Sequence, residues 1–106
     1  MSDIIGAFVT ASSPEEARAI GRGVLEKRVA ACVNILPGAE SHYWWEGNLE
    51  TAQECVLLFK TRREHLEALV AAVKALHSYT VPEVIAFPIE GGNADYLKWV
   101  EAEARP

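Results

Sequence analysis

The side chains able to bind ligands or carry protons gather in four short stretches, where they are interleaved with aromatic residues. They are Tyr43, Trp45, Glu46, Lys60, His77, Tyr79, Glu83, Tyr96 and Trp99. Lys60 and Glu83 stand in otherwise apolar stretches, and Lys and Glu are almost never buried unless they are paired. We therefore expect each to meet the other, another charge or a ligand. Two interpretations stay open: a ligand site and a salt bridge between subunits.

Histidines and cysteines do not form a recognisable metal motif. His42, His65 and His77 lack ligand spacing such as H-x-x-x-H, and no C-x-x-C occurs. We expect His77 near the end of a helix, where it serves either as a cation favoured at that end or as a ligand. Cys32 and Cys55 lie in apolar runs and are predicted to be buried free thiols.

Nucleophilic catalysis lacks a convincing set of residues. The serines stand at turn or helix-cap positions, and no G-x-S-x-G surrounds any of them. The sequence therefore predicts a protein that is not an enzyme.

Composition narrows the class of protein. The 106 residues contain 10 Lys and Arg against 15 Asp and Glu, which gives a net charge of −5, and 50% are hydrophobic. This length predicts one domain over residues 1–106. An acidic chain argues against general nucleic-acid binding, and no apolar run approaches the ~20 residues of a membrane span. With no signal-peptide pattern at the start, we expect a cytoplasmic protein.

The elements that must position these residues follow from periodicity and turn signals. Strands are predicted at about residues 4–10, 30–46, 49–61 and 83–90, and the second of them should bend at Pro37-Gly38. A capping box of Ser13 and Glu16 predicts a helix from Pro14 to about Lys27. Further helices are predicted from a capping box beginning at Thr61 to about His77, and after a cap at Asn93. The order is an α+β, ferredoxin-like βαββαβ plan with four antiparallel strands, a long central hairpin and an extra C-terminal helix.

The central hairpin does not suit a monomer. Gly47-Asn48 predicts its turn, and its strands are longer than the usual ~5–6 residues. Trp44 and Trp45 are adjacent in a strand, so they point to opposite faces, and one domain cannot cover both. The simplest partner is another copy of this chain.

The sequence resembles the CutA family of divalent-cation tolerance proteins along nearly its whole length. The resemblance is carried by KRVAACVNILPGAESHYWWEGNLE, ECVLLFKTRRE and LHSYTVPEVIAFPIEGGNADYLKWV. It implies a ferredoxin-like fold, a tight homotrimer formed through the long hairpins, and clefts between subunits as in the trimeric PII signalling proteins.

The resemblance also implies binding of Cu(II) or a related divalent cation. The family's proposed ligands align with Val9, Leu76 and His77, so only His77 carries a ligand side chain here. We therefore expect weak metal binding by His77 and a carboxylate such as Glu83.

The leading hypothesis is a CutA-like homotrimer that responds to metal ions, with Tyr43, Trp44, Trp45 and Glu46 in the trimer interface. The alternative is a PII-like module that binds a small anionic metabolite in an intersubunit cleft, with candidate residues Lys60, Tyr79, Glu83, Tyr96 and Trp99. A third possibility is a structural scaffold in which the aromatic residues only pack.

Overall fold

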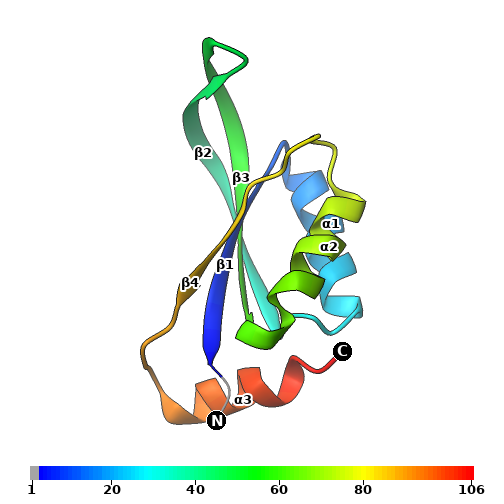
Figure 1. Cartoon of the computed structure of the whole chain (residues 1–106), viewed down its shortest axis with the longest axis vertical. Coiled ribbons are helices and arrows are strands. Elements are labelled where there is room, and N and C mark those ends of the chain that lie inside the picture. The colour runs from blue at the N-terminus through cyan, green and yellow to red at the C-terminus, as the bar shows by residue number, and fades with distance from the viewer. Residues whose placement is uncertain (1–2) are drawn as a thin grey trace.

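The computed structural model describes residues 3–106 and contains one antiparallel sheet of four strands. Their order in the sheet is β2-β3-β1-β4, and Figure 1 shows the helices α1 and α2 together on one side of it. The elements are β1 (Ile4–Ala11), α1 (Pro14–Glu26), β2 (Cys32–Trp45), β3 (Asn48–Arg62), a 3₁₀ turn (Arg63–His65), α2 (Leu66–Leu76), β4 (Val84–Pro88) and α3 (Ala94–Glu103). The predicted ferredoxin-like order with an extra C-terminal helix is confirmed.

The face of the sheet that α1 and α2 cover is the core. Every second residue of the two central strands points to it, including Val9, Leu57 and Phe59, which are fully buried. Ile20 and Val24 from α1 and Leu69 and Val73 from α2 close it from the other side and are also fully buried. We call this the covered face.

The opposite face of the sheet, which we call the open face, carries no helix over most of its length. Leu36, Ile85 and Phe87 point to this face and keep 50%, 46% and 50% of their surface exposed. Among the helices of residues 3–106, only α3 approaches it, across the end of the sheet far from the hairpin tip (Figure 1). The strands thus leave an apolar surface that no other described element covers.

The hairpin of β2 and β3 extends well beyond the other strands, and the described chain measures 44 × 25 × 21 Å (Figure 1). Its strand β2 is bent at a bulge between Leu36 and Ala39, where Pro37-Gly38 was expected to bend it. The predicted turn position was wrong by one residue. Trp45 pairs with Asn48, so the turn is Glu46-Gly47, and both have positive φ (49° and 83°) as a type I′ turn requires.

The helix ends agree with the predicted caps in two cases of three. Ser13 accepts a hydrogen bond from the backbone N–H of Glu16, and Asn93 accepts one from Asp95. The capping box at Thr61 was wrong. Thr61 is buried and its hydroxyl donates to the carbonyl of Val29, so the second helix starts through a 3₁₀ turn without a side-chain cap.

None of the helices within residues 3–106 is both long and apolar enough to cross a membrane.

Candidate functional site

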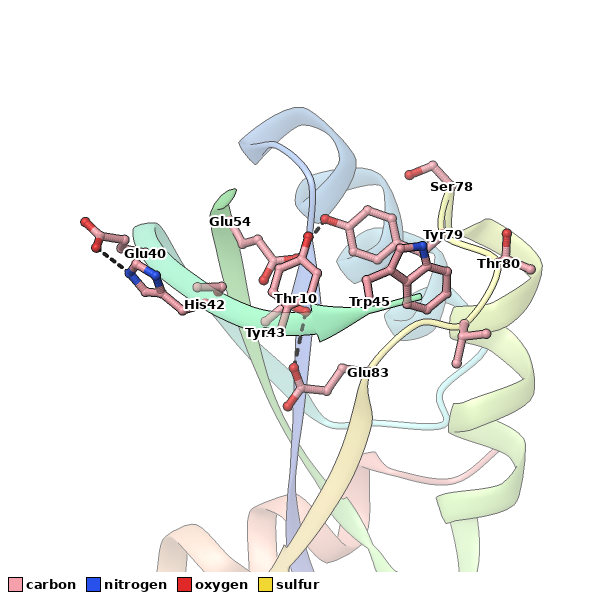
Figure 2. A pocket seen from close by; sticks show the side chains of 12 residues that line it. Thr10, Glu40, His42, Tyr43, Trp45, Glu54, Ser78, Tyr79, Thr80 and Glu83 are labelled. Atoms are coloured by element: carbon pink, nitrogen blue, oxygen red, sulfur yellow. Dashed lines mark hydrogen bonds and ion pairs between the residues drawn. The ribbon is translucent and has the colours of Figure 1, made fainter. Parts of the chain in front are cut away.

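A cleft of about 720 Å³ lies where the hairpin, the end of β1 and the loop after α2 meet. Figure 2 shows that its walls come from four separate parts of the chain. It is lined by Thr10, Glu40, Ser41, His42, Tyr43, Trp45, Glu54, Ser78, Tyr79, Thr80, Val81 and Glu83. Its size is within the ~300–1,000 Å³ typical of small-molecule sites.

The charged groups of the cleft are carboxylates. Glu54 comes from β3, Glu83 immediately precedes β4, and Glu40 lies on β2 at the rim with His42. His42 bonds Glu40 at 2.7 Å and Thr51 at 3.1 Å. Within residues 3–106, no Lys or Arg lines the cleft. The cleft is therefore acidic without a compensating positive side chain.

Tyr79 fixes the most buried of these carboxylates. Its hydroxyl donates to Oε2 of Glu54 at 2.7 Å, and Glu54 is only 8% exposed. Burial, followed by this hydrogen bond to a carboxylate, raises the pKa of the Tyr79 phenol. The phenol therefore stays protonated and keeps donating to Glu54 throughout the physiological range.

His77 lies directly behind Tyr79, with its imidazole buried and the two ring centres 4.5 Å apart. The backbone N–H of Tyr79 donates to Nδ1 at 3.0 Å, which places the ring proton on Nε2. Nε2 then donates to the carbonyl of Thr10 at 2.7 Å. Both ring nitrogens are thus engaged by the chain, and a metal ion at His77 must first displace one of these bonds.

Glu16 is the residue of this region that the sequence did not single out for a role beyond a helix cap. One oxygen accepts hydrogen bonds from the N–H and hydroxyl of Ser12, and the other accepts from the N–H of Ser78. Burial alone would raise the pKa of Glu16, but the bonds from Ser78 and Ser12 outweigh it and lower the pKa to about 2. Glu16 therefore ties the loop that carries Ser78 and Tyr79 to the start of α1. Glu16 and Ser78 are 62 residues apart, so no local sequence pattern could predict their contact.

The structure separates Lys60 from the other charged residues of the predicted cluster. Lys60 pairs with Gly6 of β1 and its ammonium bonds Asn34, whereas Glu83 bonds Thr10, four residues farther along β1. Four residues of strand span about 13 Å. Lys60 and Glu83 therefore do not pair within one chain, and the salt bridge between subunits stays a prediction.

Tyr96 and Trp99 form a second aromatic group, which is not part of the cleft. It lies beside Cys32, the residue of β2 that pairs with Lys60. Their rings lie 5.6 Å apart on α3, and the Tyr96 hydroxyl is 3.2 Å from Sγ of Cys32. The bond to Cys32, followed by burial, raises the pKa of Tyr96 to about 12. The predicted ligand-cleft set is thus divided: Tyr79 and Glu83 line the cleft, while Lys60, Tyr96 and Trp99 do not.

The aromatic residues of the hairpin tip are divided in the same way. Tyr43 and Trp45 line the cleft, and Trp44 is not among its lining residues and is 73% exposed. Glu46 stands in the turn. Their predicted place in a trimer interface stays a prediction.

The donor groups of one chain do not form a closed metal centre. Among residues 3–106, no three His, Cys, Asp or Glu side chains come close enough to share a metal ion. Cys32 and Cys55 are both free, as predicted; Cys55 is buried and Cys32 is half-buried. The predicted pair His77 and Glu83 stays a prediction, and both side chains contact Thr10 rather than each other.

Comparison with known proteins places the chain in a family. The model of the CutA1 divalent ion tolerance protein family matches residues 5–103. The chain belongs to the CutA1 family. The CutA resemblance found in the sequence is therefore confirmed, along with the fold that it implied.

Relatives within the CutA1 family are similar over most of this chain. "Protein CutA 1, chloroplastic" of Oryza sativa subsp. japonica is 48% identical over 101 residues, which cover 95% of this chain and 57% of that protein. The "Divalent-cation tolerance protein CutA" of Thermus thermophilus is 49% identical over 93 residues, covering 88% of this chain and 90% of that one. The chain thus spans little more than half the length of the rice relative.

A solved CutA1 structure matches the whole fold. The crystal structure of CutA1 from Oryza sativa superposes with a TM-score of 0.95 at 46% identity, covering 98% of this chain and 95% of that one. The long hairpin and the C-terminal helix are therefore features shared with a known CutA1 protein.

Proposed function

We propose that this chain binds divalent cations and contributes to the response to metal ions without catalysing a reaction. The observation that carries the proposal is the acidic cleft, whose lining holds Glu40, Glu54 and Glu83 and, within residues 3–106, no Lys or Arg. Oxygen and imidazole groups are ligands for divalent cations, and uncompensated carboxylates attract them. The name of the Thermus thermophilus relative, a divalent-cation tolerance protein, agrees with this role.

Metal binding in this proposal is weak and uses few ligands from each chain. Glu83 is the exposed carboxylate beside Thr10, and His77 can join it only by releasing the Thr10 carbonyl or the N–H of Tyr79. Cu(II) binds imidazole strongly, so it is the cation whose bond to His77 best offsets the loss of one of these hydrogen bonds.

The working form in this proposal is a homotrimer. The open face supports association, since Leu36, Ile85 and Phe87 stay about half exposed in one chain. Exposed apolar patches of this kind mark association surfaces. The hairpin also exposes large aromatic side chains, with Trp44 at 73% exposure, and burial against a partner would cover them too.

An anionic metabolite is the less supported ligand. That alternative needs Lys60 near Tyr79 and Glu83, but Lys60 bonds Asn34 and does not line the cleft. Phosphate and carboxylate ligands are commonly held by basic side chains. A purely structural role for the aromatic residues is the outcome if no cation binds.

The cytoplasmic location is likewise our proposal. Two free thiols, Cys32 and Cys55, suit a reducing compartment. Fractionation of cells that express the native gene tests it, and recovery outside the cytoplasm would contradict it.

Calorimetric titration of chelator-treated protein with Cu(II) tests metal binding. We expect saturable binding that Glu83→Gln and His77→Ala each weaken, with His65→Ala as a control because His65 bonds the carbonyl of Ala104 outside the cleft. Isotherms that neither substitution in the cleft region changes would remove both residues from the account. No binding by the wild-type protein would refute metal binding by this chain.

A further inference from the structure

The cleft contains a buried carboxylate without a positive partner. Glu54 is 8% exposed, its Oε2 accepts from the uncharged hydroxyl of Tyr79, and its Oε1 accepts no hydrogen bond from residues 3–106. Buried charges in proteins are normally paired. Figure 2 shows Glu54 directed into the same space as Tyr79 and Glu83, so this charge faces the cleft and can meet a ligand there.

The spacing of the carboxylates suits an extended cation better than a single metal ion. Glu54 lies on β3 and Glu83 adjoins β4, and these strands flank β1 on opposite sides. Two strand spacings separate their backbones by about 10 Å. Oxygens that share one metal ion lie within about 5 Å of each other, since each is ~2.0–2.6 Å from it. The described residues contain no group of three that meets such a condition.

Three aromatic side chains also line the cleft. Tyr43, Trp45 and Tyr79 line it from the hairpin and from the loop after α2. Aromatic faces attract ammonium groups and bury the methylene carbons attached to them, whereas a metal ion surrounded by water gains little from them. The cleft of about 720 Å³ also exceeds what one metal ion fills.

We infer that this cleft binds a small organic cation with primary ammonium groups. One ammonium group bonds Glu54, the carbon chain lies against Trp45 and Tyr79, and a second ammonium group reaches Glu83. This goes beyond the proposed metal binding, because it assigns a different chemical class of ligand and gives a direct ligand contact to Glu54, which is not a metal ligand in that proposal.

Isothermal titration of the assembled, chelator-treated protein with 1,4-diaminobutane tests the inference. We expect saturable binding to the wild-type protein and none of 1,4-butanediol, which has the same length and no charge. Glu54→Gln keeps an oxygen that accepts from Tyr79 and should weaken the diamine about tenfold through loss of the charge. Glu83→Gln at an exposed position provides a second variant should Glu54→Gln unfold.

Adjacent tryptophans give a matched pair for the aromatic wall. Trp45→Leu should weaken the diamine about threefold, and Trp44→Leu should leave its affinity unchanged, provided that sedimentation shows both variants assembled as the wild type. The inference is overturned if the wild-type protein gives no saturable heat with the diamine. This would also be the result if a Lys or Arg side chain of a neighbouring copy already filled the cleft. Equal binding of the diol, or unchanged affinity in both glutamate variants, also overturns it.

The outcome is separable from that of metal binding. Cu(II) binding with no diamine binding refutes only this inference, and diamine binding with no Cu(II) binding refutes only the proposed metal function.

Discussion

On the covered face of the sheet, Leu57 and Phe59 have no exposed surface, because α1 and α2 lie over them. On the open face, Leu36, Ile85 and Phe87 keep about half of theirs. Both faces belong to the same strands, and both carry large apolar side chains. The difference shows that the described chain covers one face of its sheet by itself and leaves apolar side chains exposed on the other, which is the surface that the proposed trimer would use.

Phe59→Ala should produce the largest effect, since it opens a cavity in the covered face. We expect the free energy of unfolding to fall by about 3–5 kcal/mol, measured by urea unfolding at fixed chain concentration. A loss below ~1 kcal/mol would mean that the covered face is not the core that stabilises the chain.

Phe87→Asp should separate the chains while leaving each one folded. A charge in an apolar interface is costly unless it is paired, so association should weaken at least about tenfold. Sedimentation velocity would show a shift from about 35 kDa toward the 11.6 kDa of one chain. Lys74→Asp on the exposed side of α2 serves as the control and should leave association unchanged. Unaltered sedimentation of Phe87→Asp would place the interface elsewhere.

Glu16→Ala should weaken the link between α1 and the cleft loop. We expect a loss of about 1–3 kcal/mol in the free energy of unfolding, because the bonds to Ser12 and Ser78 are lost. The neighbouring Glu15→Ala, whose side chain is exposed, should cost at most about 0.5 kcal/mol.

The same residue predicts a pH dependence. The pKa of Glu16 is about 2 in the folded chain against 4.5 for an unperturbed Glu, so its stabilisation is complete above pH 4.5. It should be lost as the pH falls from about 4.5 toward 2. Urea unfolding at a series of pH values measures this, and wild-type and Glu16→Ala proteins whose stabilities fall in parallel over that interval would contradict it.

The smallest effect on stability is expected for Tyr96→Phe, and Tyr79→Phe in the cleft is the substitution to compare with it. Tyr96→Phe removes only the contact with Cys32 and should cost at most about 1 kcal/mol, without changing Cu(II) or diamine binding. Tyr79→Phe frees Glu54 and should alter diamine affinity measurably. Equal effects of the two substitutions on binding would contradict the separation of the cleft from the α3 aromatic group.

The helices and strands could be predicted from the sequence, but the contacts between residues of different elements could not. Periodicity and caps at Ser13 and Asn93 depend on neighbouring residues, so they could be predicted. Thr61 shows the limit: its hydroxyl meets Val29, 32 residues away, and this tertiary bond replaces the predicted helix cap.

The candidate site was predicted in part for the same reason. Tyr79 and Glu83 do line one cleft of the chain, as residues of the same loop between two elements, and their role as ligand residues stays a prediction. Lys60 lies outside this cleft within one chain, since strand register decides which residues meet, and residue types alone do not determine register. Glu54 was missed because one Glu in the alternating polar and apolar pattern of β3 looks like an ordinary exposed residue, and only the fold buries it.

The bulge at Pro37-Gly38 decides which tryptophan faces the cleft. Before the bulge, even-numbered residues of β2 such as Leu36 share a face with Val56, and after it odd-numbered residues such as Ala39 share a face with Glu54. Pairing every residue of β2 without a bulge would instead put Trp44 on that face, whereas deleting one residue there would remove the bulge and keep Trp45 opposite Asn48. Among hairpin length variants, one deletion at Pro37-Gly38 should consequently preserve the cleft wall, and a second deletion there should turn Trp44 toward the cleft in place of Trp45.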